Sequence, residues 1–364
     1  MQILYDGYIY EQQTAGGINR YFANLISRLP ETVLPAITTC QPRNLNYPNH
    51  PNLKTFFYKR FGFKPGRICY WLEQYYFQAV SHFNRFSVFH PTYYSLLSRQ
   101  ELNQSKYPVV LTVYDMIHEL FAPQIDPDGK QAEIKKRAIL SAQAIICISE
   151  STKHDLLERY SLPEEIITVT HLASEIDASM SYGSEPVPSQ PYYLYVGGRG
   201  TYKNFDRLLV AFAKTISKHP EIKLCVVGST FNCEEHQRIS ELKLEQSIEH
   251  YGYVSDRHLA KLYRYSMAFV YPSLYEGFGI PPLEAMSCGT PVIASNISSI
   301  PEVVGDAGIL FNPESSDDLA DILLSVLDNP LERDLLIDRG YNRSKLFCWN
   351  QTVAQTMGVY RSVI

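Results

Sequence analysis

Short, fully apolar runs recur along this chain, and each is followed by a polar or glycine turn and then by a segment with helical spacing. The runs occupy residues 109–113, 144–148, 192–196, 224–227, 268–271 and 291–294. Strands that are apolar on both faces are typical of parallel sheets covered by helices. Residues 204–217 show the helical counterpart, with these apolar residues on one face: Phe205, Leu208, Leu209, Phe212 and Ile216. The pattern predicts an α/β protein with doubly wound parallel sheets.

The chain has 364 residues, more than one hydrophobic core usually organises, so two domains are expected. Residues 181–191 are rich in proline, serine and glycine and lack periodicity, as linkers do. We therefore expect one α/β domain over residues 1–180 and a second over residues 190–348. Residues 349–364 have helical spacing at Val353, Met357 and Tyr360.

Composition restricts the partners. The chain carries 33 basic and 38 acidic residues, a net charge of −5, so nothing in its overall charge favours a nucleic-acid partner. Seven scattered cysteines without a C-x-x-C pair favour reduced thiols over a disulfide framework or a zinc site. The first residues lack the features of a signal peptide, and no apolar run has membrane-spanning length. We expect a soluble, cytoplasmic protein.

The most informative motif lies between residues 271 and 291. Two carboxylates, Glu276 and Glu284, bracket a Gly-Phe-Gly turn and a Pro-Pro pair. Glycines allow the backbone to approach a ligand closely, and the prolines suit the first turn of a helix. The exposed amides of such a helix start attract anions. The carboxylates can bind the hydroxyl groups of a ligand, and the neighbouring amides can bind its phosphates. This combination predicts a sugar-nucleotide site.

A second motif, residues 195–204, reads Tyr-Val-Gly-Gly-Arg-Gly-Thr-Tyr-Lys-Asn. It places Arg199 and Lys203 after a strand, where ligands of parallel sheets bind, although a glycine turn with two solvated charges is an equal alternative. Neither G-x-G-x-x-G nor a Walker A loop is present, which disfavours a dehydrogenase or a kinase. Tyr253 and Val254 follow another strand and could offer backbone groups to a flat base, or simply form a junction.

Taken in order, these pieces closely resemble glycosyltransferase family 4. The resemblance covers the second half densely, through Glu276-Gly-Phe-Gly-Ile-Pro-Pro-Leu-Glu284, and continues through Cys288-Gly-Thr-Pro291 and Pro301-Glu302-Val-Val-Gly305. The first half agrees more loosely, in the Gly16-Gly17 loop and in residues 113–119 and 148–153. Members of that family are retaining enzymes of the GT-B fold that use nucleotide sugars. The resemblance implies two Rossmann-like domains facing each other across a cleft, with the last helix crossing back to the first domain.

The resemblance also implies residue roles. Glu284 would hold the ribose hydroxyls and Glu276 those of the donor sugar, while the leaving diphosphate would be neutralised without a metal ion by Arg199 and Lys203. The N-terminal domain would bind the acceptor, and Gly17 would close against the phosphates. The amides of three further residues would face sugar and phosphate: Phe278, Gly279 and Ile280.

Two positions depart from the family pattern. The phosphate arginine of many relatives aligns with Gly198, so Arg199 would substitute from one residue later. A histidine of the second signature aligns with Tyr114. His118 is then either its replacement or an unrelated surface histidine, and Tyr114 is a weaker acceptor candidate. No carboxylate pair is evidently placed as nucleophile and acid, so retention rests on the resemblance.

Three other features leave alternatives open. Asp126-Pro127-Asp128-Gly129 contains a D-x-D pattern, but its proline and glycine favour a β-turn over a cation site. His90 ends an apolar run and either contacts an acceptor or is structural. Residues 54–86 combine six basic residues, one acid and many aromatics, which indicates either membrane or glycan contact or ordinary core packing.

The sequence therefore predicts a retaining, metal-independent hexosyltransferase without a cofactor. Its donor is a nucleotide sugar, UDP-glucose as the best choice, and its acceptor is a glycan or lipid-linked sugar in polysaccharide biosynthesis. Peripheral contact with the inner face of the membrane stays open. Two rival functions are a GT-B-type sugar-nucleotide epimerase and a catalytically silent sugar-nucleotide-binding partner protein.

Overall fold

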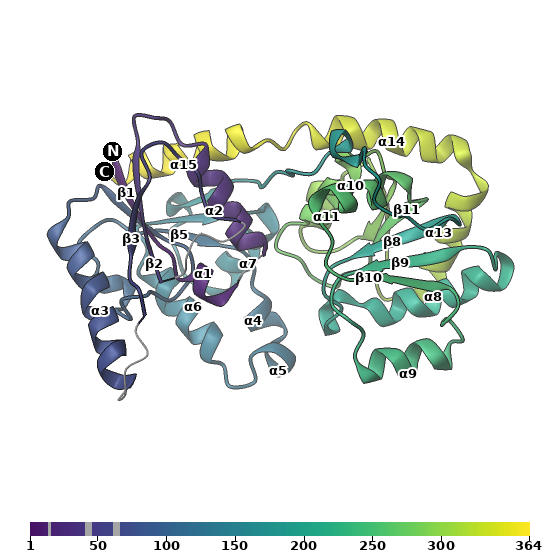
Figure 1. Cartoon of the computed structure of the whole chain (residues 1–364), viewed down its shortest axis with the longest axis horizontal. Coiled ribbons are helices and arrows are strands. Elements are labelled where there is room, and N and C mark those ends of the chain that lie inside the picture. The colour runs from purple at the N-terminus through teal and green to yellow at the C-terminus, as the bar shows by residue number, and fades with distance from the viewer. Residues whose placement is uncertain (14–15, 41–45, 61–65) are drawn as a thin grey trace. The chain divides into compact units, whose positions relative to one another are not determined.

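The computed structural model describes residues 1–13, 16–40, 46–60 and 66–364. These residues form two compact units (Figure 1). The N-terminal unit consists of Met1–Leu172 together with Trp349–Ile364, and the C-terminal unit consists of Ala173–Cys348.

The described strands of the N-terminal unit pair in parallel throughout. They form one sheet of order β3-β2-β1-β4 and one of order β5-β6-β7. A parallel bridge between Phe89 and Val109 connects the two sheets. The bounds are β1 (Gln2–Asp6), β2 (Leu34–Thr39), β3 (Lys54–Phe57), β4 (Val88–Pro91), β5 (Val110–Val113), β6 (Ala144–Cys147) and β7 (Ile167–Val169).

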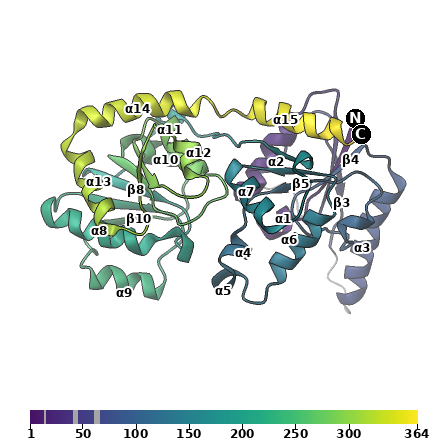
Figure 2. The ribbon, with the colours of Figure 1, turned by 180° about the vertical axis from the view of Figure 1, so that it is seen from behind.

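Helices connect these strands, as parallel pairing requires. The last helix of the chain, α15, packs on α2 and on β6 of this unit (Figure 2), and its Val353, Met357 and Tyr360 are buried as the sequence predicts. The bounds are α1 (Ile9–Gln12), α2 (Gly17–Ser27), α3 (Gly66–Phe83), α4 (Ile117–Leu120), α5 (Ala122–Ile125), α6 (Lys130–Leu140), α7 (Glu150–Arg159) and α15 (Trp349–Ser362).

The C-terminal unit is built on a parallel sheet of order β10-β9-β8-β11-β12-β13. Its central strands are buried along almost their whole length, which explains why they read as uninterrupted apolar runs. The bounds are β8 (Tyr192–Val196), β9 (Lys223–Val227), β10 (Ile248–Tyr251), β11 (Ala268–Tyr271), β12 (Val292–Ser295) and β13 (Ile309–Phe311).

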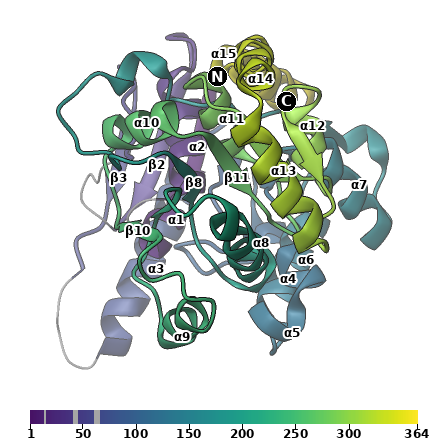
Figure 3. The ribbon, with the colours of Figure 1, turned by 90° about the vertical axis from the view of Figure 1, so that its right-hand side faces the viewer.

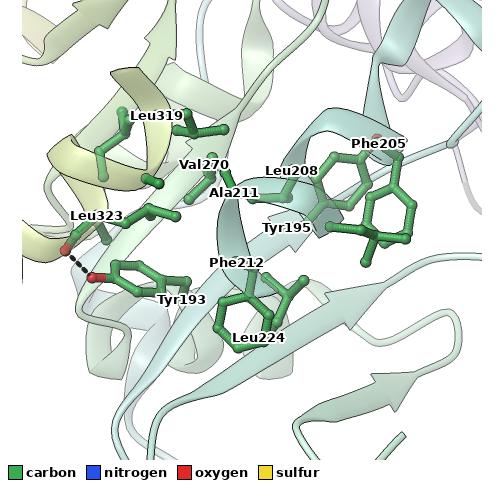
Figure 4. Close-up of a cluster of buried hydrophobic side chains, with 14 of the residues drawn as sticks. Tyr193, Tyr195, Phe205, Leu208, Ala211, Phe212, Leu224, Val270, Leu319 and Leu323 are labelled. Atoms are coloured by element: carbon green, nitrogen blue, oxygen red, sulfur yellow. Dashed lines mark hydrogen bonds between the residues drawn. The ribbon is translucent and has the colours of Figure 1, made fainter. Parts of the chain in front are cut away.

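Helices α8 and α13 pack side by side in this unit (Figure 3). Their apolar faces meet side chains from β8, β9 and β11 in one buried cluster (Figure 4), to which α8 contributes Leu208, Ala211 and Phe212. The bounds are α8 (Phe205–Lys218), α9 (Cys233–Glu241), α10 (Asp256–Tyr265), α11 (Ile280–Ser287), α12 (Ile300–Val304), α13 (Ser316–Asp328) and α14 (Pro330–Ser344). The predicted strands and the predicted helix over 204–217 are confirmed.

The expected linker differs from the structure. The division between the units falls between Leu172 and Ala173, ahead of residues 181–191. Lys261 of α10 donates hydrogen bonds to the carbonyls of Gly183 and Glu185, 2.7 Å each, and a ring nitrogen of His258 lies 2.7 Å from the Pro186 carbonyl. The polar, aperiodic composition of residues 181–191 therefore indicates an exposed segment rather than an interdomain linker. Side chains of α10 attach this segment to the C-terminal unit.

Among the described helices, none combines the length and the apolar character needed to cross a bilayer.

Candidate donor site

The strand order of the C-terminal unit identifies where a ligand would bind. From β8 the chain adds β9 and β10 on one side, then returns to add β11, β12 and β13 on the other. Ligands of open parallel sheets bind outside the carboxyl ends of the strands at such a reversal. The segments that follow β8 and β11 contain Lys203 and Glu276, respectively, so both predicted motifs lead to this point.

Lys203 and Glu276 form an ion pair, with 2.6 Å between Nζ and Oε1. Both side chains are largely but not completely covered. The ammonium group also lies 4.8 Å from the centre of the Tyr202 ring. Burial and the neighbouring Glu276 carboxylate raise the pKa of Tyr271 well above its usual range. The pair therefore places one cation and one anion at the point where the strand order reverses. The Tyr271 side chain beside them is a neutral phenol.

Two serines that sequence reasoning missed hold the turn that carries Glu276. Ser298 donates to the carbonyl of Glu276 at 2.6 Å. The hydroxyl oxygen of the buried Ser299 lies 2.8 and 2.7 Å from the carbonyls of Glu276 and Phe278, between which its one hydrogen is shared. Both serines follow β12 and precede α12. Both serines lie more than twenty residues after the turn, so no local sequence pattern relates them to it.

Asn204 fixes the segment on the other side of the pair. It adopts a left-handed conformation with φ of 57°, which asparagine tolerates better than most residues. Its side-chain amide donates to the carbonyl of Pro272, the residue that follows β11, at 3.0 Å, and to that of Pro313 at 2.8 Å. This buried amide ties the residue after Lys203 to the chain leading to Glu276. The sequence placed Asn204 only at a helix start.

Glu284 lies in α11 and is only 7% exposed. Tyr263 of α10 donates its hydroxyl hydrogen to Oε2 of Glu284 at 3.0 Å, which orients the carboxylate. Gly279 precedes the helix with φ of 119°, a region that L side chains rarely adopt, so glycine is required at this turn. Pro281 and Pro282 occupy the start of α11 as predicted.

Arg199 is bound to a carboxylate of a neighbouring helix. Its side chain is only 3% exposed and bonds Glu235 of α9 at two points, 2.7 Å from Nε to Oε1 and 3.2 Å from Nη2 to Oε2. The guanidinium also lies 4.6 Å from the centre of the Phe231 ring. Burial opposes ionisation of Glu235, yet the hydrogen bonds from Arg199 and from the Asn232 amide lower its pKa. Glu235 pairs with this guanidinium as Glu276 pairs with Lys203, but Nη1 of Arg199 is buried and has no hydrogen-bond partner among the described residues. The predicted contact of Arg199 with the diphosphate stays a prediction.

The remaining predicted donor contacts lie around the same strand ends. Gly198 is exposed, and a side chain there would meet nothing within 4 Å. Tyr253 is almost fully exposed and Val254 half-buried in the turn after β10. Phe278 is buried, so only its backbone could serve a ligand, and Ile280 is the first residue of α11.

Two predicted residues lie in the N-terminal unit. Gly17 is the exposed first residue of α2, and a side chain would meet nothing there. His118 lies half-buried in α4, and its Nδ1 is buried with no hydrogen-bond partner among the described residues. An unpartnered buried nitrogen is compatible with a ligand contact, and the functional role of His118 stays a prediction.

His90 and Tyr114 need a correction as acceptor residues. His90 is completely buried, with Nδ1 2.6 Å from the Tyr360 hydroxyl and Nε2 2.8 Å from the Thr112 hydroxyl. Burial lowers the pKa of His90 to about 3, so the ring is neutral. Tyr114 is also buried and donates to the carbonyl of Thr92 at 3.2 Å. Both side chains join β4, β5 and α15 inside the core and cannot reach an acceptor there.

The D-x-D pattern is a turn, as the sequence favoured. The Gly129 amide donates to the Asp126 carbonyl at 2.8 Å, and Oδ2 of Asp126 accepts from the Ala132 amide at 2.8 Å at the start of α6. Asp128 pairs with Lys130 on the surface. In the described part of the chain, the cluster with metal-binding spacing consists of His154, Asp155 and Glu158 on the exposed side of α7, far in sequence from the donor motifs.

Comparisons with known proteins agree with the sequence motifs. A family model described as Glycosyltransferase Family 4 matches residues 15–173, and one described as Glycosyl transferases group 1 matches residues 183–343. The chain is 31% identical over 266 residues to O-antigen chain mannosyltransferase B of Escherichia coli, covering 69% of this chain and 70% of that protein.

A second relative and a solved structure extend the comparison. MMP alpha-(1->4)-mannosyltransferase of Mycolicibacterium hassiacum is 30% identical over 237 residues, which cover 64% of this chain and 57% of that protein. The structure of sucrose-phosphate synthase from Thermosynechococcus elongatus has a TM-score of 0.75 at 20% identity, covering 99% of this chain and 98% of that one. This likeness concerns the fold, and it confirms the GT-B fold expected from the sequence.

Proposed function

Because this chain belongs to glycosyltransferase family 4, we propose that it moves a hexosyl group from a nucleotide sugar to a hydroxyl group of a glycan or lipid-linked acceptor. Family membership makes it a glycosyltransferase of glycan biosynthesis. One observation carries the finer proposal: Lys203 and Glu276 are paired at 2.6 Å at the point where the strand order reverses.

Each residue has a distinct task in this proposal. Negative charge grows on the diphosphate as it leaves, and stabilisation of such charge by preorganised cations and hydrogen-bond donors is usually the largest single contribution to catalysis. Lys203 supplies the cation, and Glu276 positions it before the donor arrives. The first amides of α11 add partial positive charge. Glu276 and Glu284 accept hydrogen bonds from sugar and ribose hydroxyls. These groups need no divalent metal, and retention of configuration follows the family pattern.

The donor proposed here differs from the one expected from the sequence. UDP-glucose was the best choice from the motifs alone, but both sequence relatives described above carry the name mannosyltransferase. Their similarity to this chain includes most of its length. We therefore propose a nucleotide-linked mannose as donor, with UDP-glucose as the alternative that the experiment must exclude.

A thermal-shift screen across UDP-, GDP- and ADP-linked mannose and glucose tests the donor. A ligand held at about 100 times its dissociation constant adds about 2.7 kcal/mol to the apparent stability, so the correct donor should stand out. In the Glu284→Ala variant, loss of a hydrogen bond to a charged group, worth about 1.5–3 kcal/mol, should weaken nucleotide binding about 10- to 150-fold. Glu314→Ala, on an exposed turn of the same unit, is the matched control. Equal affinity in the two variants would contradict the assignment of Glu284.

The rival functions give different products. An epimerase would release a free, epimerised sugar in the absence of any acceptor, and a silent binding protein would show a thermal shift without turnover on any glycan. A glycosyltransferase must instead form a new glycosidic bond, detectable as a mass increase of one hexose on the acceptor.

We also propose that α3 contacts a membrane surface. Its outer face exposes large apolar side chains, and Trp71 is 63% exposed and stacked on Tyr75 at 5.9 Å between ring centres. The acid of this helix, Glu73, is buried against Arg60, whereas Arg67 is exposed. An apolar, aromatic face beside uncompensated positive charge suits an anionic bilayer. Residues 61–65 of the basic segment noted above lie outside the described residues.

Vesicle flotation checks this contact. The Trp71→Ser/Tyr75→Ser variant should bind vesicles containing phosphatidylglycerol more than tenfold less than the parent, since burying one large apolar side chain is worth about 1.5–3 kcal/mol. Leu331→Ser on α14, which removes another highly exposed apolar side chain, should bind as the parent does. Equal binding of all three proteins, or parent binding that does not depend on phosphatidylglycerol, would rule out α3 as the contact.

A further inference from the structure

Ser298, in the loop between β12 and α12, adopts a left-handed backbone conformation with φ of 57°. Among the described residues, three other non-glycine residues do so: Arg99, Asn204 and Lys243. Residues with a side chain rarely adopt this conformation, and where they do, the surrounding structure must hold them in it. Two of the four, Asn204 and Ser298, hydrogen-bond the segment that leads to and carries Glu276. Left-handed residues from two different loops therefore hold this segment.

The hydroxyl group of Ser298 bonds both backbone polar groups of Glu276. It donates to the Glu276 carbonyl at 2.6 Å and accepts from the Glu276 amide at 3.3 Å. One donor and one acceptor position of the hydroxyl are thus used on a single residue. Because the groups on both sides of the Glu276 Cα atom are held, the direction in which the side chain leaves the backbone is held as well.

The left-handed turn by itself does not require a serine. Glycine adopts this conformation without steric cost, whereas serine keeps a Cβ atom that the conformation disfavours. What serine adds is a hydroxyl group, and within the described residues both of its hydrogen bonds go to Glu276. Strain of this kind is typical of sites where a functional group has to be placed. The strain at Ser298 therefore points to the placement of Glu276.

The Glu276 side chain is also held at its other end. Its Oε1 lies 2.6 Å from Nζ of Lys203, which follows β8, whereas Ser298 follows β12. The side chain is 12% exposed, so a ligand can still reach it. Both ends of the side chain are thus fixed before a donor binds. Such preorganisation lowers the ordering cost of binding and favours one orientation of the ligand.

We propose that Ser298 is a positioning residue for the donor sugar: through the backbone of Glu276, its hydroxyl sets where the Glu276 carboxylate meets the sugar hydroxyls. The inference rests on the proposed function, in which Glu276 accepts hydrogen bonds from the sugar. Ser298 needs no contact with the donor for this task. Loss of its hydroxyl should weaken recognition of the sugar and slow transfer, while the nucleoside diphosphate alone binds as before.

Two substitutions of Ser298 separate the hydroxyl group from the shape of the turn. Ser298→Ala removes the hydroxyl and keeps the strained Cβ atom, whereas Ser298→Gly removes both. Each should lower kcat about tenfold, which lies between the about fivefold effect of one lost hydrogen bond and the about 100-fold effect of a 1 Å misplacement in an active site. If only the shape of the turn mattered, Ser298→Gly would transfer sugar at the parent rate, and the proposal would be overturned.

Lys243→Gly is the matched control for the relief of strain. Lys243 has φ of 56° and is exposed between α9 and β10, so this variant should keep the parent kcat and donor affinity. A second control places Ser298→Gly in a Glu276→Ala background, where it should change donor affinity less than about twofold, because the residue through which it acts is gone. A loss as large as in the parent background would mean that the hydroxyl acts on another group, which contradicts the proposal.

Calorimetry keeps the test independent of transfer. It compares the nucleotide sugar selected by the thermal-shift screen with the corresponding nucleoside diphosphate. Both Ser298 variants should bind the nucleotide sugar about fivefold more weakly than the parent and the diphosphate equally well. This result supports the inference even if no transfer is detected, in which case only the proposed transfer fails.

The opposite results are equally clear. Parent-like binding of the nucleotide sugar by Ser298→Gly, or an equal loss of affinity for both ligands, overturns the inference and leaves the proposed function intact. A parent protein that binds none of the nucleotide sugars overturns both.

Discussion

Replacing Lys203 by alanine should lower kcat for sugar transfer at least about 100-fold, the usual cost of removing one preorganised donor from a site of developing negative charge. Lys203 is the cation at the strand-order reversal of the C-terminal unit, 2.6 Å from Glu276. Arg199, the other cation of the glycine motif, is paired with Glu235 and so does not take the place of Lys203 beside Glu276. The loss should therefore appear mainly in kcat, with a smaller change in donor affinity.

Steady-state kinetics with the donor found in the thermal-shift screen measure this effect. Lys214→Ala is the control, since Lys214 lies on α8 in the same unit and pairs with Asp317 on the surface. It removes the same charge and should retain full activity. A Lys203→Ala enzyme that folds and transfers sugar at the parent rate would remove Lys203 and the paired Glu276 from the reaction.

Replacing Lys135 by methionine should destabilise the N-terminal unit by about 3–5 kcal/mol, because it leaves a buried carboxylate without its partner. The Lys135 side chain is 0% exposed, and its ammonium group lies 2.8 Å from Oε2 of Glu119. It also donates to the carbonyl of Asp115 at 2.9 Å and lies 5.6 Å from the centre of the Tyr94 ring. One lysine thus joins α6 to α4 and to the end of β5.

Urea denaturation followed by hydrogen exchange of peptides from α6 and β6 measures the stability of this unit by itself. The neighbouring Lys136 is exposed, so Lys136→Met should change stability by no more than about 0.5 kcal/mol. In the double variant Glu119→Leu/Lys135→Met the buried unpaired carboxylate is gone. Only the partly exposed Asp115, whose carboxylate lies 3.7 Å from the ammonium group, still loses its partner, so most of the loss should be recovered. An equal loss in Lys135→Met and Lys136→Met would show that the buried pair contributes nothing.

Much of the donor site could be predicted from local sequence alone. Gly-Phe-Gly followed by Pro-Pro specifies a tight turn and a helix start, and the structure has a left-handed Gly279 and α11 in these places. Apolar runs specify buried parallel strands, whose carboxyl ends must meet at one edge of a sheet. Lys203 and Glu276 follow such strands, so their proximity could be predicted without atomic coordinates.

The pairings that the sequence could not reveal share one physical origin. Arg199 meets Glu235, 36 residues later in the chain, and His90 meets Tyr360, 270 residues later. Whether a side chain faces solvent or a partner depends on the residues that the fold brings beside it. The sequence could name the chemical groups but not which of them neutralise one another.

By itself, the sequence determined the fold class, the two-unit organisation and the segments that carry the donor chemistry, because apolar periodicity and turn residues act over a few neighbouring positions. Only the tertiary structure decided that Lys203 rather than Arg199 is the cation placed beside Glu276, that Ser298 and Ser299 hold the turn, and that His90 is a core residue. These outcomes depend on which side chains are buried and on which charged and polar groups pair with one another. Such contacts exist only once distant parts of the chain have packed together.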